Sequence, residues 1–254
     1  MKQTLLRLTP VPLLEMYRSV KRWAERRRNA GRTTEQIFTE IYRAGKWGGG
    51  EGNLCSGGGS VHDEIVGPYV RAVARLLDGI TEFPVQIVDL GCGDFRVGRQ
   101  LLDHCESYTG VDIVPDVVAA NQAEFGSSKC RFLKLNIIDD PLPAGTVCCV
   151  RQVLQHLSND QILKILPKLN QYRLVLVTEH YPSDNPQIRP NLDKVHGAGI
   201  RLYQNSGVYL DRTPFAALAG KLEQVIEVQG HGFDGGIEPG VIRTFAIRPP
   251  DSKR

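Results

Sequence analysis

The chain contains no apolar run of the roughly 18 residues that are needed to span a bilayer, and its N-terminal residues include no continuous apolar stretch of the signal-peptide type. None of its six cysteines belongs to a CxxC pair, and no histidines stand at zinc-binding spacing. We therefore expect a cytoplasmic protein with reduced thiols and no metal site.

A strong overall charge is also absent, since the net charge is only +3 over 254 residues. The charge is nevertheless uneven: residues 1–32 carry +7, which leaves −4 for the remainder. A basic segment of this kind suggests contact with a protein or with the inner membrane surface, and the alternative is a surface helix that packs on its own domain. No basic groove with interleaved aromatic residues follows, which argues against nucleic acid as a partner.

Short β-rich runs alternate with helical segments through most of the chain. Strands are predicted at 85–90, 108–113, 130–137, 146–152 and 173–179, with helices near 96–104, 115–125 and 158–169. This alternation predicts a doubly wound, Rossmann-like α/β fold, whose parallel sheet is covered on both faces. Two further runs at 222–230 and 241–249, which follow a predicted helix at 214–222, have no helix between them and predict an antiparallel hairpin at the sheet edge.

Helical periodicity also precedes the first strand, at 11–29, 33–44 and 61–80, and Thr33 or Thr34 is the expected cap of the second helix. We divide the chain into an N-terminal helical and glycine-rich extension, residues 1–60, and a main domain, residues 61–254.

The stretch VDLGCGDFRVG (88–98) follows the first predicted strand, where a nucleotide site is expected. It has Gly91 and Gly93 but lacks the third glycine of a dinucleotide fingerprint, since Arg96 stands there. Asp89 would repel a diphosphate but could hold an ammonium group, and Asp112, at the end of the second strand, can accept hydrogen bonds from ribose hydroxyls. S-adenosylmethionine fits such a site; the alternative is a turn whose glycines only pack and whose aspartates only cap.

These residues resemble motif I of the class I S-adenosylmethionine-dependent methyltransferases. The likeness covers roughly residues 40–180 and includes WGGGEGNLCSGGGS, CGDF, YTGVDIVPDVVAANQ, DDPLP and RQVLQHLSNDQI, as in a bacterial branch of that superfamily. It implies a seven-stranded sheet, with Gly91 and Gly93 under the methionine portion and Asp112 on the ribose. It also implies that Asn136 and Ile137 flank the adenine.

Residues 45–60, GKWGGGEGNLCSGGGS, contain eight glycines. We interpret this segment as a lid over the cofactor, with a plain linker as the alternative. Its backbone N–H groups could bind a carboxylate such as that of the methionine moiety. The predicted cofactor-binding set, besides the residues given above, is Trp47, Ser56, Gly57, Ser60, Cys92, Ile113 and Gln152.

An alcohol acceptor needs a base, whereas an amine needs only a free lone pair. The candidate catalytic residues follow the fourth and fifth strands or lie in the polar stretch after them, and are His180, His156, His196 and Glu179. His180 ranks first because it follows Glu179 at the carboxyl end of a strand. The sequence favours methyl transfer to oxygen of a sugar or other small hydroxylated metabolite. The alternatives are a protein or RNA methyltransferase and a non-catalytic module that docks through its basic N-terminal helix.

Overall fold

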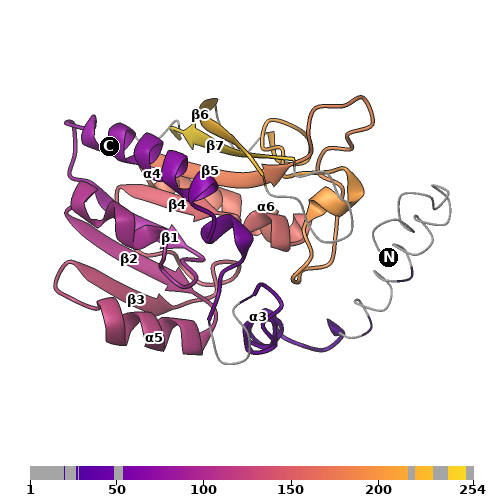
Figure 1. The fold of residues 1–254 in the computed structure, drawn as a ribbon, viewed down its shortest axis with the longest axis horizontal. Coiled ribbons are helices and arrows are strands. Elements are labelled where there is room, and N and C mark those ends of the chain that lie inside the picture. Colours follow the sequence, from indigo (N-terminus) through magenta and orange to yellow (C-terminus); the bar gives the residue numbers. More distant parts are fainter. Residues whose placement is uncertain are drawn as a thin grey trace.

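The protein is described here from a computed structural model, over residues 20, 27, 29–48, 54–216, 221–230 and 240–249. A seven-stranded sheet runs through it in the order β3-β2-β1-β4-β5-β7-β6 (Figure 1). Its strands are β1 (Gln86–Leu90), β2 (Ser107–Asp112), β3 (Cys130–Lys134), β4 (Val147–Arg151), β5 (Leu174–Tyr181), β6 (Leu222–Gln229) and β7 (Val241–Ile247). β1 to β5 are parallel, whereas β7 is antiparallel to both β5 and β6. The predicted Rossmann-like sheet with an antiparallel edge hairpin is confirmed.

Successive hydrophobic side chains along the strands point to opposite faces of the sheet and form two separate cores, one on each face. In β4, Cys148 and Val150 belong to one cluster, while Val147 and Cys149 belong to the other. This follows from the period of two in a strand, which turns successive side chains to opposite faces. Both faces of the sheet are thus buried, as a parallel sheet requires.

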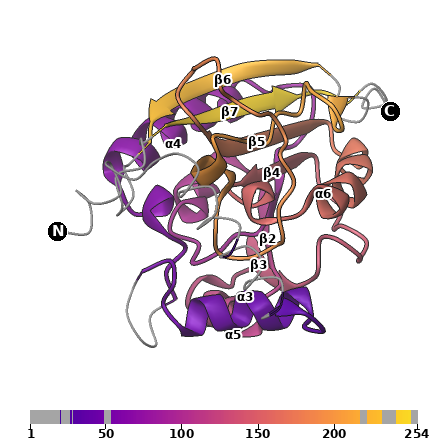
Figure 2. The same ribbon diagram turned by 90° about the vertical axis from the view of Figure 1, so that its right-hand side faces the viewer.

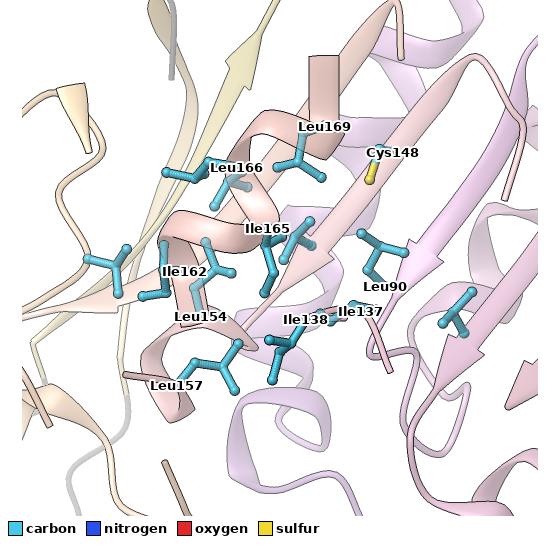
Figure 3. Packing of buried hydrophobic residues seen from close by; sticks show 14 of the residues in the cluster. Leu90, Ile137, Ile138, Cys148, Leu154, Leu157, Ile162, Ile165, Leu166 and Leu169 are labelled. Atoms are coloured by element: carbon cyan, nitrogen blue, oxygen red, sulfur yellow. The ribbon is translucent and has the colours of Figure 1, made fainter. Parts of the chain in front are cut away.

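Helices cover both faces. α4 (Asp63–Asp78) packs on the second cluster through Val73 and Leu77, while α6 (Asn159–Ile165) packs on the first. In Figure 3 the side chains of Ile162 and Ile165 point from α6 toward the strand residues Leu90 and Cys148. α5 (Pro115–Phe125) contacts β2 and β3.

α3 (Thr34–Arg43) begins at a capping box, in which the Thr33 hydroxyl accepts from the Gln36 backbone N–H and the Gln36 side chain accepts from that of Thr33. Ile37 and Ile41 on this helix join the sheet's first core. α3 lies beyond the ends of β1 and β2 in Figure 1 and in front of α5 in Figure 2. An ion pair of 3.0 Å between Arg43 and Asp116 connects it to α5.

Several predicted boundaries were wrong. The fifth strand does not end at 179 but continues to Tyr181, because β7 pairs with it from Val175 to Tyr181 and all its residues are buried. The helix expected at 158–169 is broken into α6 and a 3-10 segment, Leu166–Gln171, that contains Pro167 near its start. Residue 222, expected to end a helix, instead begins β6.

Three predicted features lie wholly or largely outside the described residues: the basic helix at 11–29, the turn between the last two strands, and residues 49–53 of the glycine-rich stretch. Partner contact through residues 1–32 and a domain boundary at residue 60 both stay predictions. Over the described part of the chain, no helix combines the length and the apolar character that a membrane span requires.

Candidate functional site

A pocket lies at the carboxyl edge of β1, β2 and β4, where the loops after these strands meet α3 and the 54–60 segment, here called the entry segment. The first loop reaches it through two glycines in the left-handed region, Gly91 at φ +77° and Gly93 at φ +54°. A Cβ on Gly91 would collide with Val153, and one on Gly93 would collide with Ser56. The glycines are therefore required by their protein neighbours as well as by any ligand.

Asp112, the last residue of β2, is 7% exposed and lines this pocket. One carboxylate oxygen accepts from the Gly93 backbone N–H at 3.1 Å and the other from that of Val114 at 3.0 Å. Burial raises the pKa of Asp112, and these amide bonds oppose the rise. Each oxygen keeps a lone pair, so the fixed carboxylate can still accept from two vicinal hydroxyls.

Asp89, in β1, lies beneath the glycine loop and also lines the pocket. It accepts a hydrogen bond of 2.6 Å from the Tyr108 hydroxyl. Burial raises its pKa to about 6, which the Tyr108 hydrogen bond and the nearby charge of Arg151 partly offset. The carboxylate is thus placed to receive a cationic group in the pocket.

Arg151, which the sequence analysis missed, ends β4 and enters the same part of the pocket. Its guanidinium donates to the Ser60 hydroxyl at 3.1 Å and to the Gly59 carbonyl at 2.5 Å, and it lies 4.9 Å from the centre of the Tyr69 ring. Burial lowers its pKa. Its Nε is buried and has no hydrogen-bond partner among the described residues. A buried N–H of a cationic group that lacks a partner is suited to bind an anionic group of a ligand.

The signal for Arg151 was present in the sequence, since it is a charge directly after the apolar run VCCV. A charged side chain at the carboxyl end of a buried parallel strand is a candidate for a ligand contact.

The entry segment is tied to the glycine loop by a reciprocal pair. The Asp94 backbone N–H donates to the Ser56 hydroxyl at 2.7 Å, and the Ser56 backbone N–H donates to the Asp94 carboxylate at 3.2 Å. Tyr42 from α3 hydrogen-bonds the same Ser56 hydroxyl at 3.3 Å. Together with the Arg151 contacts, these bonds hold residues 56–60 against the pocket.

Asn136 lies in the loop after β3, where its side-chain oxygen accepts from the Ile138 backbone N–H at 3.0 Å and its amide donates to Asp139 at 3.0 Å. The side chain therefore shapes its own turn while it lines the pocket. Ile113 and Ile137 add apolar surface beside it, as a slot for a flat base would require.

His156 lies in a short 3-10 segment after β4 and lines the pocket. Its Nδ1 is 3.2 Å from the Gly197 carbonyl, which can only accept, so Nδ1 carries the proton. Burial, together with the charge of Lys194, lowers the pKa of His156 to about 3. The ring is therefore neutral, and Nε2 presents a lone pair whose protein contact is the Gln155 amide, at a long 3.5 Å.

The other three candidate catalytic residues lie elsewhere. Because β5 is longer than expected, His180 and Glu179 lie inside it, paired with Ile242 and Arg243 of β7, and neither lines the pocket. Glu179 is 0% exposed and accepts three backbone N–H bonds, the shortest 2.8 Å from Leu154. It anchors the loop that carries His156.

His196 also does not line the pocket; its Nδ1 is 3.1 Å from the side-chain nitrogen of Gln161.

All but one of the predicted cofactor-binding residues line this pocket. The exception is Gly57, whose φ of +94° places it against Trp47 instead. Phe38 and Tyr42 of α3 line it too and were missed, because no local pattern shows that this helix folds across the sheet edge. Within the described part of the chain, no three His, Cys, Asp or Glu side chains are placed to hold a metal ion.

Comparison with known proteins agrees with this geometry. A family model described as a methyltransferase domain matches residues 87–172. TehB from Haemophilus influenzae is similar in structure at a TM-score of 0.50 and 13% identity, over 83% of this chain and 66% of that one.

The N-methyltransferase NodS from Bradyrhizobium japonicum, solved with S-adenosylhomocysteine, is similar at a TM-score of 0.49 and 14% identity, over 75% of this chain and 90% of that one. No curated protein sequence matches. At 13% identity the likeness to TehB shows the fold, and the domain match adds the activity. The resemblance to the class I S-adenosylmethionine-dependent methyltransferases is therefore confirmed: residues 87–172 match a methyltransferase domain, and the sheet around them has the same fold.

Proposed function

We propose that this enzyme transfers the methyl group of S-adenosylmethionine to an oxygen atom of a small hydroxylated acceptor. The observation that carries the choice of oxygen is the neutral His156 ring, which lines the pocket that also contains Asp112, with its Nδ1 fixed on Gly197 and its Nε2 held only by a long 3.5 Å contact to the Gln155 amide.

The donor fits one orientation. Asp112 would accept from the ribose hydroxyls, and Asn136 with Ile137 would flank the adenine. At the opposite end, Asp89 would pair with the amino group and Arg151 with the carboxylate of the methionine portion. The zwitterionic amino-acid end of the donor would then pair with one fixed charge of each sign, and such pairing offsets the cost of burying its charges.

The acceptor hydroxyl would donate its hydrogen bond to His156 Nε2. As the C–O bond forms and the C–S bond breaks, the oxygen becomes a cationic oxonium and gives its proton to Nε2, while S-adenosylhomocysteine leaves as a neutral thioether. An oxonium proton is far more acidic than an imidazolium, even one with a pKa of about 3. His156 can therefore take this proton despite its burial.

An amine acceptor would use the site less well. After methylation its nitrogen is an ammonium group, whose pKa near that of lysine lies far above the pKa of His156, so the proton would stay on nitrogen. In this pocket the imidazole thus assists an oxygen acceptor and gives no comparable help to an amine.

The test is turnover with labelled S-adenosylmethionine and a metabolite extract, followed by identification of the methylated product. His156→Ala should lower kcat by about 10²–10⁴-fold, the usual share of acid–base catalysis, and leave S-adenosylhomocysteine affinity nearly unchanged. His104→Ala is the matched control, because His104 pairs with Asp78 at the surface, far from the pocket lining.

His180→Ala and His196→Ala decide between the three histidines. A large loss of kcat in either of them, with full activity in His156→Ala, would overturn the assignment. A methylated nitrogen in the product would overturn the choice of oxygen, and a methylated protein or RNA would overturn the small acceptor.

A further inference from the structure

The charged lining residues of the pocket come from the sheet and the loop after β1. They are Asp89, Asp94, Asp112 and Arg151, all contributed by β1, β2, β4 or the loops that follow β1. A second part of the lining, here called the uncharged side, comes from α3, Trp47 and the segment after β4, and its residues are Thr34, Phe38, Tyr42, Trp47, Gln152, Val153, His156 and Leu157. With His156 neutral, none of these residues carries a charge.

Aromatic rings form a continuous wall on this uncharged side. The Trp47 ring centre is 5.1 Å from that of Tyr42, 6.0 Å from that of Phe38 and 4.9 Å from that of His156. The Trp47 indole N–H donates to the Ala198 carbonyl at 3.4 Å, so its polar edge is occupied. The wall therefore offers apolar ring faces to an acceptor.

Few polar groups remain on this side to meet an acceptor. The Tyr42 hydroxyl is bonded to Ser56, and His156 Nδ1 is bonded to Gly197. What remains is the Thr34 hydroxyl, the buried Gln152 amide nitrogen, which has no partner among the described residues, and His156 Nε2, whose contact with the Gln155 amide is a long 3.5 Å. A free sugar would leave several of its own hydroxyls unpaired against ring faces, which costs far more affinity than a missing apolar contact.

We propose that the acceptor is an uncharged, planar, largely apolar alcohol, such as a phenol, that lies against Trp47 with its hydroxyl on His156. This inference rests on the proposed O-methyl transfer and narrows its substrate class. Trp47 and α3 precede the matched methyltransferase domain at 87–172, so residues outside that domain would select the acceptor.

Four probes test the class: naphthol, naphthylamine, naphthoate and methyl glucoside, each given to the enzyme with labelled S-adenosylmethionine. Naphthol should show a kcat/KM at least about tenfold above naphthoate and methyl glucoside. Methyl glucoside as the best substrate would overturn the inference and leave O-methyl transfer intact. Methylation of naphthylamine alone would overturn the choice of oxygen while the planar, uncharged acceptor site stands.

A second experiment tests the role of Trp47. Trp47→Ala should raise the KM for naphthol by about 10–100-fold, the scale of losing an aromatic stacking partner, with kcat changed less. Trp47→Phe keeps a ring and should recover most of that loss, which separates stacking from a folding defect. S-adenosylhomocysteine affinity should stay near the wild-type value in both variants.

Two results would refute the assignment of Trp47 to the acceptor. One is a loss of S-adenosylhomocysteine affinity as large as the change in KM, because Trp47 would then contact the donor. The other is a failure of naphthol to bind calorimetrically to enzyme already saturated with S-adenosylhomocysteine. If S-adenosylhomocysteine itself does not bind, the proposed function fails first.

Discussion

Replacing Arg151 by Met tests the donor site most directly. Methionine keeps an unbranched apolar stem beside Tyr69 and removes the guanidinium, which contacts Gly59 and Ser60 and carries the unpartnered Nε. If Arg151 binds the donor carboxylate, the variant loses charge-assisted hydrogen bonds worth about 1.5–3 kcal/mol. That range corresponds to a roughly 10–150-fold loss of affinity.

A pair of ligands isolates the carboxylate. S-adenosylhomocysteine and methylthioadenosine share adenosine and a thioether, but only the first has the amino-acid group. In titration calorimetry, Arg151→Met should weaken S-adenosylhomocysteine by the full amount and methylthioadenosine by less than about threefold. The loss of affinity that both ligands share measures the lost contacts to the entry segment, as in a double-mutant cycle.

Ser60→Ala is the matched control, because it removes one of the two guanidinium contacts to the entry segment and leaves the charge. It should weaken both ligands equally, by the 0.5–1.5 kcal/mol of an ordinary hydrogen bond or less. An equal loss for both ligands in Arg151→Met would refute the carboxylate assignment, since the arginine would then act only through the entry segment. The melting temperature of the ligand-free variant shows separately how much the lost contacts to Ser60 and Gly59 contribute to stability.

Two further predictions concern the carboxylates of the donor site. Asp112→Ala should weaken S-adenosylmethionine by roughly 1.5–3 kcal/mol, measured calorimetrically, and wild-type affinity in that variant would remove the ribose assignment. Burial raises the pKa of Asp89 from 3.8 to about 6, so the folded state keeps this proton to a higher pH than the unfolded chain. Asp89 should therefore make the ligand-free protein less stable as the pH rises from about 4 to 6. The loss is about 3 kcal/mol at most, from 1.36 kcal/mol per pKa unit. S-adenosylhomocysteine affinity should rise over the same range. Asp89→Asn should reduce both dependences, and burial of Glu179 and Asp112, which raises their pKa values too, accounts for what remains.

The fold could be predicted from the sequence because its signals are local. The alternation of β-rich and helical runs, and the missing helix before β7, fix a parallel sheet with an antiparallel edge. Asp89 and Asp112 could be placed at the pocket for the same reason, since both lie near the carboxyl ends of predicted strands and parallel strands bring such residues to one edge.

The acceptor side could not be predicted, because long-range pairing decides it. His180 was ranked first as a residue leaving a strand, but β7 pairs past it and keeps it inside β5. Phe38 reaches the pocket only because α3 packs across the ends of β1 and β2. A local sequence pattern predicts neither how far an antiparallel partner strand extends nor where a helix docks.

The reciprocal bonds between Ser56 and Asp94 have a kinetic consequence. They join the entry segment to the loop that carries Gly91 and Gly93, and Arg151 fastens the same segment to β4. If the segment covers the donor, S-adenosylhomocysteine would leave only after these bonds break, and this barrier to its release would not depend on the acceptor. In enzymes of this design, release of product can set the pace of turnover while the methyl transfer itself is fast.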